Sequence, residues 1–402
     1  MKLVTNIRET LYDLASIRES KESKIKRTIK EFVKLFIFRY SLSGEEHEFL
    51  FVNTVKREDH STFFNKIYDL CNYDKGFLIW TRKKCINFRN ILNCIKYIPS
   101  FKELNEICIP EDSQLYDPHN QYIKICYLDK LALYYKLITN IDMKRVANEY
   151  NWGKSKHLVV LFDIGEPEHF LVNAANSHNI NTITASHGVF PPGFNHLIRG
   201  NYNQWNAPSK YIIAWGKSTS DLFLQYSPGI NPIICGTVHI SPKDFIPDTS
   251  TIGIVCEIHA YAEYNQKMID IAETYARKYG KKVHIRLHPG DDEKNYKIDS
   301  DVSSFYRDID NAYIIVACMS TMLFTYIAQG RRVLRFNDIK EFFFDIPETI
   351  SFKDIESFSS KANNIENIDY KAISRYYIDS IGEKAAEKYA SFFDDMHSTF
   401  SV

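Results

Sequence analysis

The sequence predicts an α/β protein with two domains that face a cleft. The chain has 402 residues, and at about 100–200 residues per domain this length suggests two domains. Short apolar runs alternate along it with longer polar stretches that are compatible with helices. Several runs are continuously apolar, which is typical of parallel strands buried on both faces. Length, alternation and continuous apolar runs therefore indicate the same architecture.

The apolar runs form two series, separated by a weakly periodic segment. The first series of expected strands covers residues 49–52, 77–80, 158–162 and 181–185. The second covers residues 211–214, 232–235, 253–256, 283–287, 313–317 and 332–336. Between them, residues 186–209 are rich in Gly, Pro and Asn, which predicts a functional loop leading to a hinge near residue 205. We therefore place the domains at 1–205 and 206–375, followed by a helical stretch, 376–402, that would pack back on the first domain.

Charge and cysteine usage narrow the function classes. The 50 Lys and Arg residues balance 50 Asp and Glu residues, which argues against a protein that grips nucleic acid. None of the eight cysteines stands in a C-x-x-C pair or at zinc-finger spacing, so we expect buried thiols in a reducing compartment. No apolar stretch is long enough to span a membrane, and the charged N-terminus lacks a signal-peptide core. We expect a cytoplasmic protein.

A basic amphipathic helix is predicted within residues 1–40. The apolar residues Ile25, Ile29, Phe32, Val33 and Phe36 recur there at helical spacing. Lysine and arginine residues stand between them. One interpretation is peripheral docking of this segment on the anionic inner face of the plasma membrane. The other is an ordinary domain helix with a solvated basic face. The sequence leaves both interpretations open.

A first candidate proton acceptor is His187, which with Gly188 directly follows the expected strand 181–185. Residues just past the carboxyl end of a parallel strand line the ligand crevice of such sheets. A histidine there can act as a base, as an acid or as a hydrogen-bond donor to a phosphate. Gly188 lets the backbone approach a ligand. The alternative is a histidine that only hydrogen-bonds within its loop.

Carboxylates provide a second set of candidate bases. Asp163, Glu166 and Glu168 follow the expected strand 158–162, again at a carboxyl edge. One of them could deprotonate an acceptor hydroxyl. They could equally cap the N-terminus of the next helix, where negative charge is favoured.

A phosphate-binding group is predicted at the corresponding edge of the second domain. Arg286 and His288 stand at the end of the run 283–287 and suit a phosphate or diphosphate of a nucleotide. Ser320 and Thr321 begin an apolar helix after the next strand, where free N–H groups form an anion site. The alternatives are an exposed histidine in a turn and plain N-capping by Ser320.

Two glycines could open further loops beside this crevice, and no metal site is predicted. Gly216 and Gly236 each end a strand-like run. The sequence contains no G-x-x-x-x-G-K-[ST] and no G-x-G-x-x-G phosphate loop. Asp308 and Asp310 form a D-x-D, but it stands in a polar segment before a strand, so we assign it no metal.

The order of these motifs resembles a known family. The sequence shows His187-Gly188, a Trp-Gly strand end, a C-G-T-V strand end, R-L-H-P, and then Ser320-Thr321 followed by Gly330. This order resembles bacterial GT-B transferases that build surface polysaccharides. The families it is similar to are the capsule polysialyltransferase-like enzymes and the CDP-glycerol glycerophosphotransferases of teichoic-acid synthesis. The resemblance covers residues 155–340 and implies two Rossmann-like domains.

The resemblance also implies roles for individual residues. It implies that His288, Ser320 and Thr321 contact the phosphate of a cytidine nucleotide. In the glycerophosphotransferases the H-G histidine is catalytic, which implicates His187. In the sialyltransferase-like enzymes the base is a carboxylate in an acidic-acidic-Gly motif, and the corresponding stretch here, F-D-I-G-E, contains Asp163 and Glu166.

We therefore expect a metal-independent glycosyltransferase of bacterial capsule or other surface-polysaccharide synthesis. It would move a sugar from a nucleotide-activated donor, favoured as CMP-sialic-acid-like, to a glycan or lipid-linked acceptor. The second domain would hold the nucleotide and the first the acceptor, and no separate cofactor is expected.

Three alternatives remain. One is transfer of an alditol phosphate from a CDP donor, and another is a non-catalytic scaffold of a polysaccharide-synthesis complex. The third, a nucleotide-sugar epimerase, would need carboxylates after the phosphate-binding loop, and residues 322–329 contain none.

Overall fold

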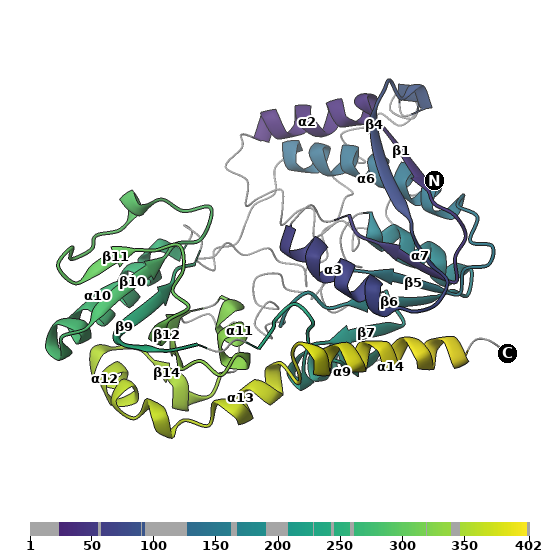
Figure 1. Ribbon diagram of the computed structural model, residues 1–402. Helices are drawn as coiled ribbons and strands as arrows, with labels where there is room; N and C mark the ends of the chain where they lie inside the picture. The colour runs from purple at the N-terminus through teal and green to yellow at the C-terminus, as the bar shows by residue number, and fades with distance from the viewer. Residues whose placement is uncertain are drawn as a thin grey trace.

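The structure is a computed structural model that describes residues 24–54, 58–89, 91–92, 127–161, 167–189, 208–227, 229–242, 245–257, 261–318, 320–338 and 346–399. Every structural statement below concerns these residues. Figure 1 shows two lobes, each built around one six-stranded sheet. The predicted α/β class is confirmed.

The first sheet is parallel and has the strand order β3-β2-β5-β6-β7-β8. Its strands are β2 (Phe49–Val52), β3 (Lys75–Phe77), β5 (His157–Val160), β6 (Asn181–Ala185), β7 (Tyr211–Ala214) and β8 (Asn231–Ile234). Helices α3 (Glu58–Leu70) and α14 (Glu383–Thr399) pack on one face. The other face is covered by α6 (Tyr127–Asn148) and α7 (Glu168–Ser177), with α9 (Lys217–Tyr226) following β7. Because both faces are covered, every residue of β2 and β5 is buried.

The second sheet is also parallel, in the order β11-β10-β9-β12-β13-β14. Its strands are β9 (Asp248–Val255), β10 (Lys282–Arg286), β11 (Ser303–Phe305), β12 (Ala312–Ala317), β13 (Val333–Phe336) and β14 (Ser351–Phe352). Helices α10 (Ala262–Tyr279) and α12 (Ile355–Asn363) pack on one face. The short α11 (Met322–Ala328) and α13 (Tyr370–Tyr377) pack on the other.

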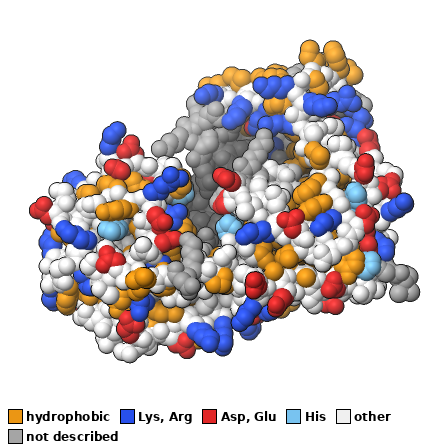
Figure 2. Space-filling view, in the orientation of Figure 1, with side chains coloured by type: hydrophobic (Ala, Val, Ile, Leu, Met, Phe, Trp, Pro, Cys, Tyr) orange, Lys and Arg blue, Asp and Glu red, His pale blue; other side chains and the backbone are white. Residues whose placement is uncertain are grey.

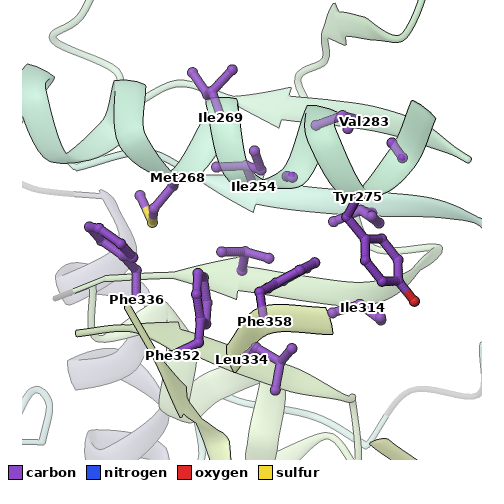
Figure 3. Packing of buried hydrophobic residues seen from close by; sticks show 14 of the residues in the cluster. Ile254, Met268, Ile269, Tyr275, Val283, Ile314, Leu334, Phe336, Phe352 and Phe358 are labelled. Carbon is purple, nitrogen blue, oxygen red and sulfur yellow. The ribbon is translucent and has the colours of Figure 1, made fainter. Parts of the chain in front are cut away.

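The core under α10 is the largest apolar cluster of the second lobe. Figure 3 shows Met268 of α10 in one cluster with Phe336 and Phe352 of the sheet and Phe358 of α12. α10 ends at Gly280, whose φ of 62° is the left-handed conformation that commonly closes a helix. The buried apolar residues of α10 thus attach the helix to the sheet, and Gly280 closes its C-terminus.

A small antiparallel ribbon and a helix extend the first lobe. Strands β1 (Phe38–Ser43) and β4 (Ile79–Lys84) pair with each other, and α2 (Lys24–Ile37) precedes β1 and packs on α6. The predicted strand 77–80 is wrong in one respect. The chain leaves the first sheet at Leu78, which separates β3 from β4, and the two strands belong to different sheets. The predicted basic helix corresponds to α2.

The chain changes sheet later than the predicted boundary at residue 205. Strands β7 and β8 pair with β6 and complete the first sheet, so the change falls between β8 and β9. The physical reason is the parallel crossover: the run 211–214 finds its partner in β6, and the weakly periodic loop before it is a connection within one sheet. After the second lobe the chain returns, and α14 buries Tyr389, Phe392 and Phe393 on the first sheet.

Candidate active site at the seam between the two sheets

The carboxyl edge of the first sheet meets helix α11 of the second lobe. Val189, which follows β6, and Trp215, which follows β7, are buried in the same apolar cluster as Leu323 and Phe324 of α11. His187 stands two residues before Val189, and Ser320 and Thr321 lead into α11, so these residues adjoin this contact, which we call the seam. Figure 2 shows histidine side chains where the two lobes face each other.

His187 lies at the seam, two residues before Val189. The buried Ser186 extends the sheet, because its N–H donates to the Ile213 carbonyl at 3.0 Å. Its hydroxyl donates to the Gly188 carbonyl at 2.7 Å, which closes the turn around His187. The His187 ring is half-buried and faces the ring of His60, with 5.0 Å between the centroids. The turn and this neighbouring ring therefore fix the orientation of the imidazole.

Sequence reasoning missed two histidines at this edge of the first sheet. His60 lies in the first turn of α3, against His187, and His239 follows β8, with its ring 6.4 Å from that of Phe63 of α3. Burial lowers the pKa of His239, and the nearby Asp59 carboxylate opposes this effect. The sequence could have indicated both residues, because each follows a strand of the first sheet, and the carboxyl ends of these strands meet at the edge where His187 lies.

Glu168 is placed by the structure in a different role from that of a base. Its side chain is almost fully buried, and Oε1 accepts hydrogen bonds from the Thr54 N–H at 2.9 Å and the Thr54 hydroxyl at 2.8 Å. It stands in the first turn of α7. It thereby fixes the loop after β2 against the start of α7. Asp163 and Glu166 lie outside the described residues.

His288 is exposed at the carboxyl end of β10, with its ring held by the following turn. The Gly290 N–H donates to Nδ1 of His288 at 3.2 Å, and the Asp291 N–H donates to the His288 carbonyl at 2.9 Å. Because Nδ1 accepts a hydrogen bond, the neutral ring carries its proton on Nε2. The ring therefore offers an N–H donor to a ligand such as a phosphate oxygen.

Ser320 and Thr321 lead into α11 beside the seam. The Ser320 hydroxyl accepts a hydrogen bond from the Met322 N–H at 3.3 Å. The N-cap residue of α11 is Thr321, which is exposed and makes no capping hydrogen bond with its side chain. The predicted N-capping by Ser320 is therefore wrong, and the Ser320 hydroxyl keeps its proton for donation to a ligand.

Arg286 points into a pocket on the face of the second sheet. Its guanidinium is 3.4 Å from the Tyr326 hydroxyl, which donates to Asp310 at 3.2 Å. Arg286, Arg307 and Asp308 line this pocket of about 410 Å³, and His288 does not. The structure therefore does not place Arg286 and His288 in one pocket.

Gly216 and Gly236 pack against the segment that returns from the second lobe, at Tyr377 and Ser380. A Cβ at Gly216 would overlap the Tyr377 carbonyl, and one at Gly236 would overlap the Ser380 carbonyl. Gly236 also has a φ of 77°, which favours glycine. The Ser380 hydroxyl donates to the Cys235 carbonyl at 2.9 Å. These contacts account for both glycines through packing. By contrast, within the part of the chain that the structure describes, no atom lies within 4 Å of a Cβ built on Gly188.

Comparison with solved structures finds the same fold at low sequence identity. A protein from Listeria monocytogenes described as a UDP-N-acetylglucosamine 2-epimerase is 9% identical, covering 89% of this chain and 97% of that chain, with a TM-score of 0.51. MnaA from S. aureus, solved with UDP, is 9% identical, covering 88% and 98%, with a TM-score of 0.52. No protein-family model and no curated protein matches the sequence.

The chain has the GT-B fold. In this GT-B chain the seam brings the turn that bears His187 next to the start of α11. The first sheet supplies imidazoles that can accept a proton, His187 with His60 against it. On the second sheet, the Nε2–H of His288 and the hydroxyls of Ser320 and Thr321 can donate to an anion.

Proposed function

We propose that this chain is a glycosyltransferase that moves a sugar from a nucleotide-activated donor to a glycan acceptor in surface-polysaccharide synthesis. The observation that carries the proposal is the seam. A turn bearing His187 and the helix that follows Ser320 and Thr321 are joined by one buried cluster through Val189, Leu323 and Phe324. This contact supports the proposal, because it joins the segment with a candidate proton acceptor to the segment with candidate hydrogen-bond donors to a phosphate.

The second lobe would hold the nucleotide and the first lobe the acceptor. The acceptor hydroxyl oxygen would attack the anomeric carbon of the donor sugar, and its proton would pass to His187. The bond from the anomeric carbon to the phosphate oxygen would break, and the nucleotide would leave with the electron pair. His288, Ser320 and Thr321 would stabilise the charge that develops on that phosphate, without a metal. Asp163 or Glu166 remains the alternative base, as the resemblance to sialyltransferase-like enzymes implies.

The proposed donor carries a cytidine nucleotide, favoured as CMP-sialic-acid-like, because of the family resemblance of the His288 and Ser320 motifs. Transfer of an alditol phosphate from a CDP donor is the related alternative, and a scaffold of a polysaccharide-synthesis complex is the non-catalytic one. The structures that share the fold support a sugar nucleotide as ligand, since one is described as an epimerase of UDP-N-acetylglucosamine and the other holds UDP. Epimerase chemistry is disfavoured because α11 has the sequence MLFTYIA, which contains no carboxylate.

The test is a phosphorus NMR assay of the chain with CMP-sialic acid, CDP-glycerol and UDP-N-acetylglucosamine, each with mixed oligosaccharide acceptors. The proposal expects a free nucleoside phosphate that accumulates only when acceptor is present. A new phosphodiester would indicate the alditol-phosphate alternative, and an isomerised sugar nucleotide would indicate an epimerase. Intact donors in every reaction would overturn the proposal in favour of a scaffold.

Variants then assign the roles. His187→Ala should lower turnover by about 10²–10⁴-fold, and His288→Ala by about 10²–10³-fold. The matched control is His178→Ala, since His178 closes α7 at the opposite edge of the first sheet. Full turnover in both seam variants would contradict the assignment.

A further inference from the structure

Helix α2 presents its apolar stripe outward, the reverse of an ordinary domain helix. Ile25 is 62% exposed and Ile29 is 56% exposed, and Val33 and Ile37 are exposed on the same stripe. Polar side chains are buried on this helix instead. The buried Thr28 donates its hydroxyl to the Leu128 carbonyl of α6 at 3.1 Å. The stripe is therefore not what attaches α2 to its own domain.

A second group of exposed apolar side chains adjoins the end of α2. Ile86, Phe88 and Leu92 follow β4, and Phe88 is 70% exposed. Two hydrogen bonds join the segments: the Cys85 N–H donates to the Ile37 carbonyl at 2.7 Å, and the Asn87 amide donates to the Phe38 carbonyl at 3.1 Å. We call the exposed residues of both segments the apolar face: Ile25, Ile29, Val33, Ile37, Ile86, Phe88 and Leu92.

Positive charge surrounds the apolar face. Lys26 and Lys30 lie exposed beside the stripe of α2, and Arg82, Lys83, Lys84 and Arg89 are exposed around the second group. The segment 79–92 contains no acidic residue. Figure 2 shows hydrophobic side chains along the upper edge of the first lobe, over α2 and the end of β4, with Lys and Arg among them. The chain as a whole has zero formal net charge, so this concentration is local.

We propose that the apolar face docks on the surface of an anionic lipid bilayer. Apolar side chains flanked by lysine and arginine match the boundary between acyl chains and anionic headgroups, where long basic side chains reach the phosphates. A second copy of the chain fits less well, because a symmetric contact would oppose two sets of the same positive charges. Among the described residues no helix is long and apolar enough to cross a membrane, so α2 would lie in the interface.

The docking places the first lobe, and not the second, against the membrane. The proposed function places the acceptor in the first lobe. On that basis, docking would present the site to a lipid-linked glycan. The binding itself follows from α2 and the segment after β4 and does not depend on the reaction.

The test is co-sedimentation of the full chain with phosphatidylcholine vesicles, with and without phosphatidylglycerol. The apolar variant is Ile29→Glu with Phe88→Glu, and the charge variant is Lys26→Glu with Lys30→Glu. The control is Ile246→Glu, which changes an exposed isoleucine of the second lobe. Tm and light scattering are measured for every variant, and turnover is measured with a soluble acceptor, so failure of the proposed function is detected separately.

The wild type and Ile246→Glu should bind phosphatidylglycerol vesicles and leave neutral vesicles in solution. The apolar variant should bind at least about tenfold more weakly, and the charge variant about 100-fold more weakly, with unchanged Tm. No binding by the wild type, or equal binding by all variants, would overturn the proposal. A fall in Tm in the apolar variant would show that protein covers this face, and a wild-type dimer broken by that variant would assign it to a second copy; either result overturns docking.

Discussion

Glu168 shows how contacts separate a structural carboxylate from a catalytic one. From sequence it is one of three candidate bases, but the structure buries it and gives it two hydrogen bonds from Thr54. A buried acceptor of this kind stabilises the folded state, since its loss leaves the Thr54 N–H without that partner.

Glu168→Ala is therefore expected to lower stability while leaving the chemistry of the folded fraction intact. Hydrogen bonds to charged groups contribute about 1.5–3 kcal/mol each, so from the two bonds we expect a loss of about 3–6 kcal/mol in the free energy of unfolding, measured by urea denaturation. Thr54→Val removes only the hydroxyl partner and should lose less. A Glu168→Ala protein with unchanged stability and no turnover would instead identify Glu168 as the base.

At the same scale, the sequence could place His187 and His288 at the ends of strands, because each closely follows a recognisable apolar run. It could not predict that the His60 ring lies against that of His187, since α3 and β6 meet only through the order of strands in the sheet. Nor could it predict that Arg286 turns toward Tyr326, because alternation along a strand fixes the side of the sheet and not the partner.

At the scale of elements, the returning segment between α13 and α14 explains two glycines that the sequence assigned to the site. Ser380 donates its hydroxyl to the Cys235 carbonyl, and its own carbonyl accepts from the Thr237 N–H at 2.9 Å. Gly236 lies under this crossing with a positive φ. The requirement for glycine at position 236 is therefore set by the segment around Ser380, which is distant in sequence and cannot be inferred from the residues next to Gly236.

Gly236→Ala should destabilise the protein, whereas Gly188→Ala should not. The left-handed conformation alone costs a non-glycine residue about 1–2 kcal/mol, and the overlap with Ser380 adds to this. Among the described residues, none lies within 4 Å of the position that a Cβ at Gly188 would take, so its substitution should leave Tm unchanged and affect only ligand binding. Thermal unfolding of the two variants checks this, and a stable Gly236→Ala protein would contradict the packing role.

Most strands could be predicted because they are short continuous apolar runs; β6 and β7 match their expected bounds. The sequence did not indicate β11 and β14, since three and two residues give no readable period. It also merged β3 with β4, because the turn at Leu78 interrupts no apolar pattern.

At the scale of the whole molecule, α14 ties the end of the chain to the first sheet beside a buried histidine. His157 begins β5, is fully buried, and stacks on Phe49 with 4.3 Å between ring centroids. Phe49 in turn packs edge-on against Phe393 of α14. A charge on His157 would therefore form inside the contact that holds α14.

This burial makes stability depend on pH. Burial lowers the pKa of His157 from 6.5 to about 4, so the unfolded chain takes up a proton between these values while the folded chain does not. Stability is present above pH 6.5 and is lost as the pH falls toward 4, by about 3 kcal/mol in full. Urea unfolding of the wild type and His157→Phe checks this: the variant should lose less stability across that window, and His288→Ala should behave as the wild type.

The central claim is that the seam binds a nucleotide-activated donor through the second sheet. Its most direct test is the thermal stability of the wild type and of His288→Ala with CMP, CDP, UDP, GDP or ADP. A ligand at about 100 times its Kd stabilises the folded state by about 2.7 kcal/mol. We predict that CMP or CDP raises the Tm of the wild type and raises that of His288→Ala much less. A wild-type Tm that no nucleotide changes, or an equal rise in both proteins, would contradict the account.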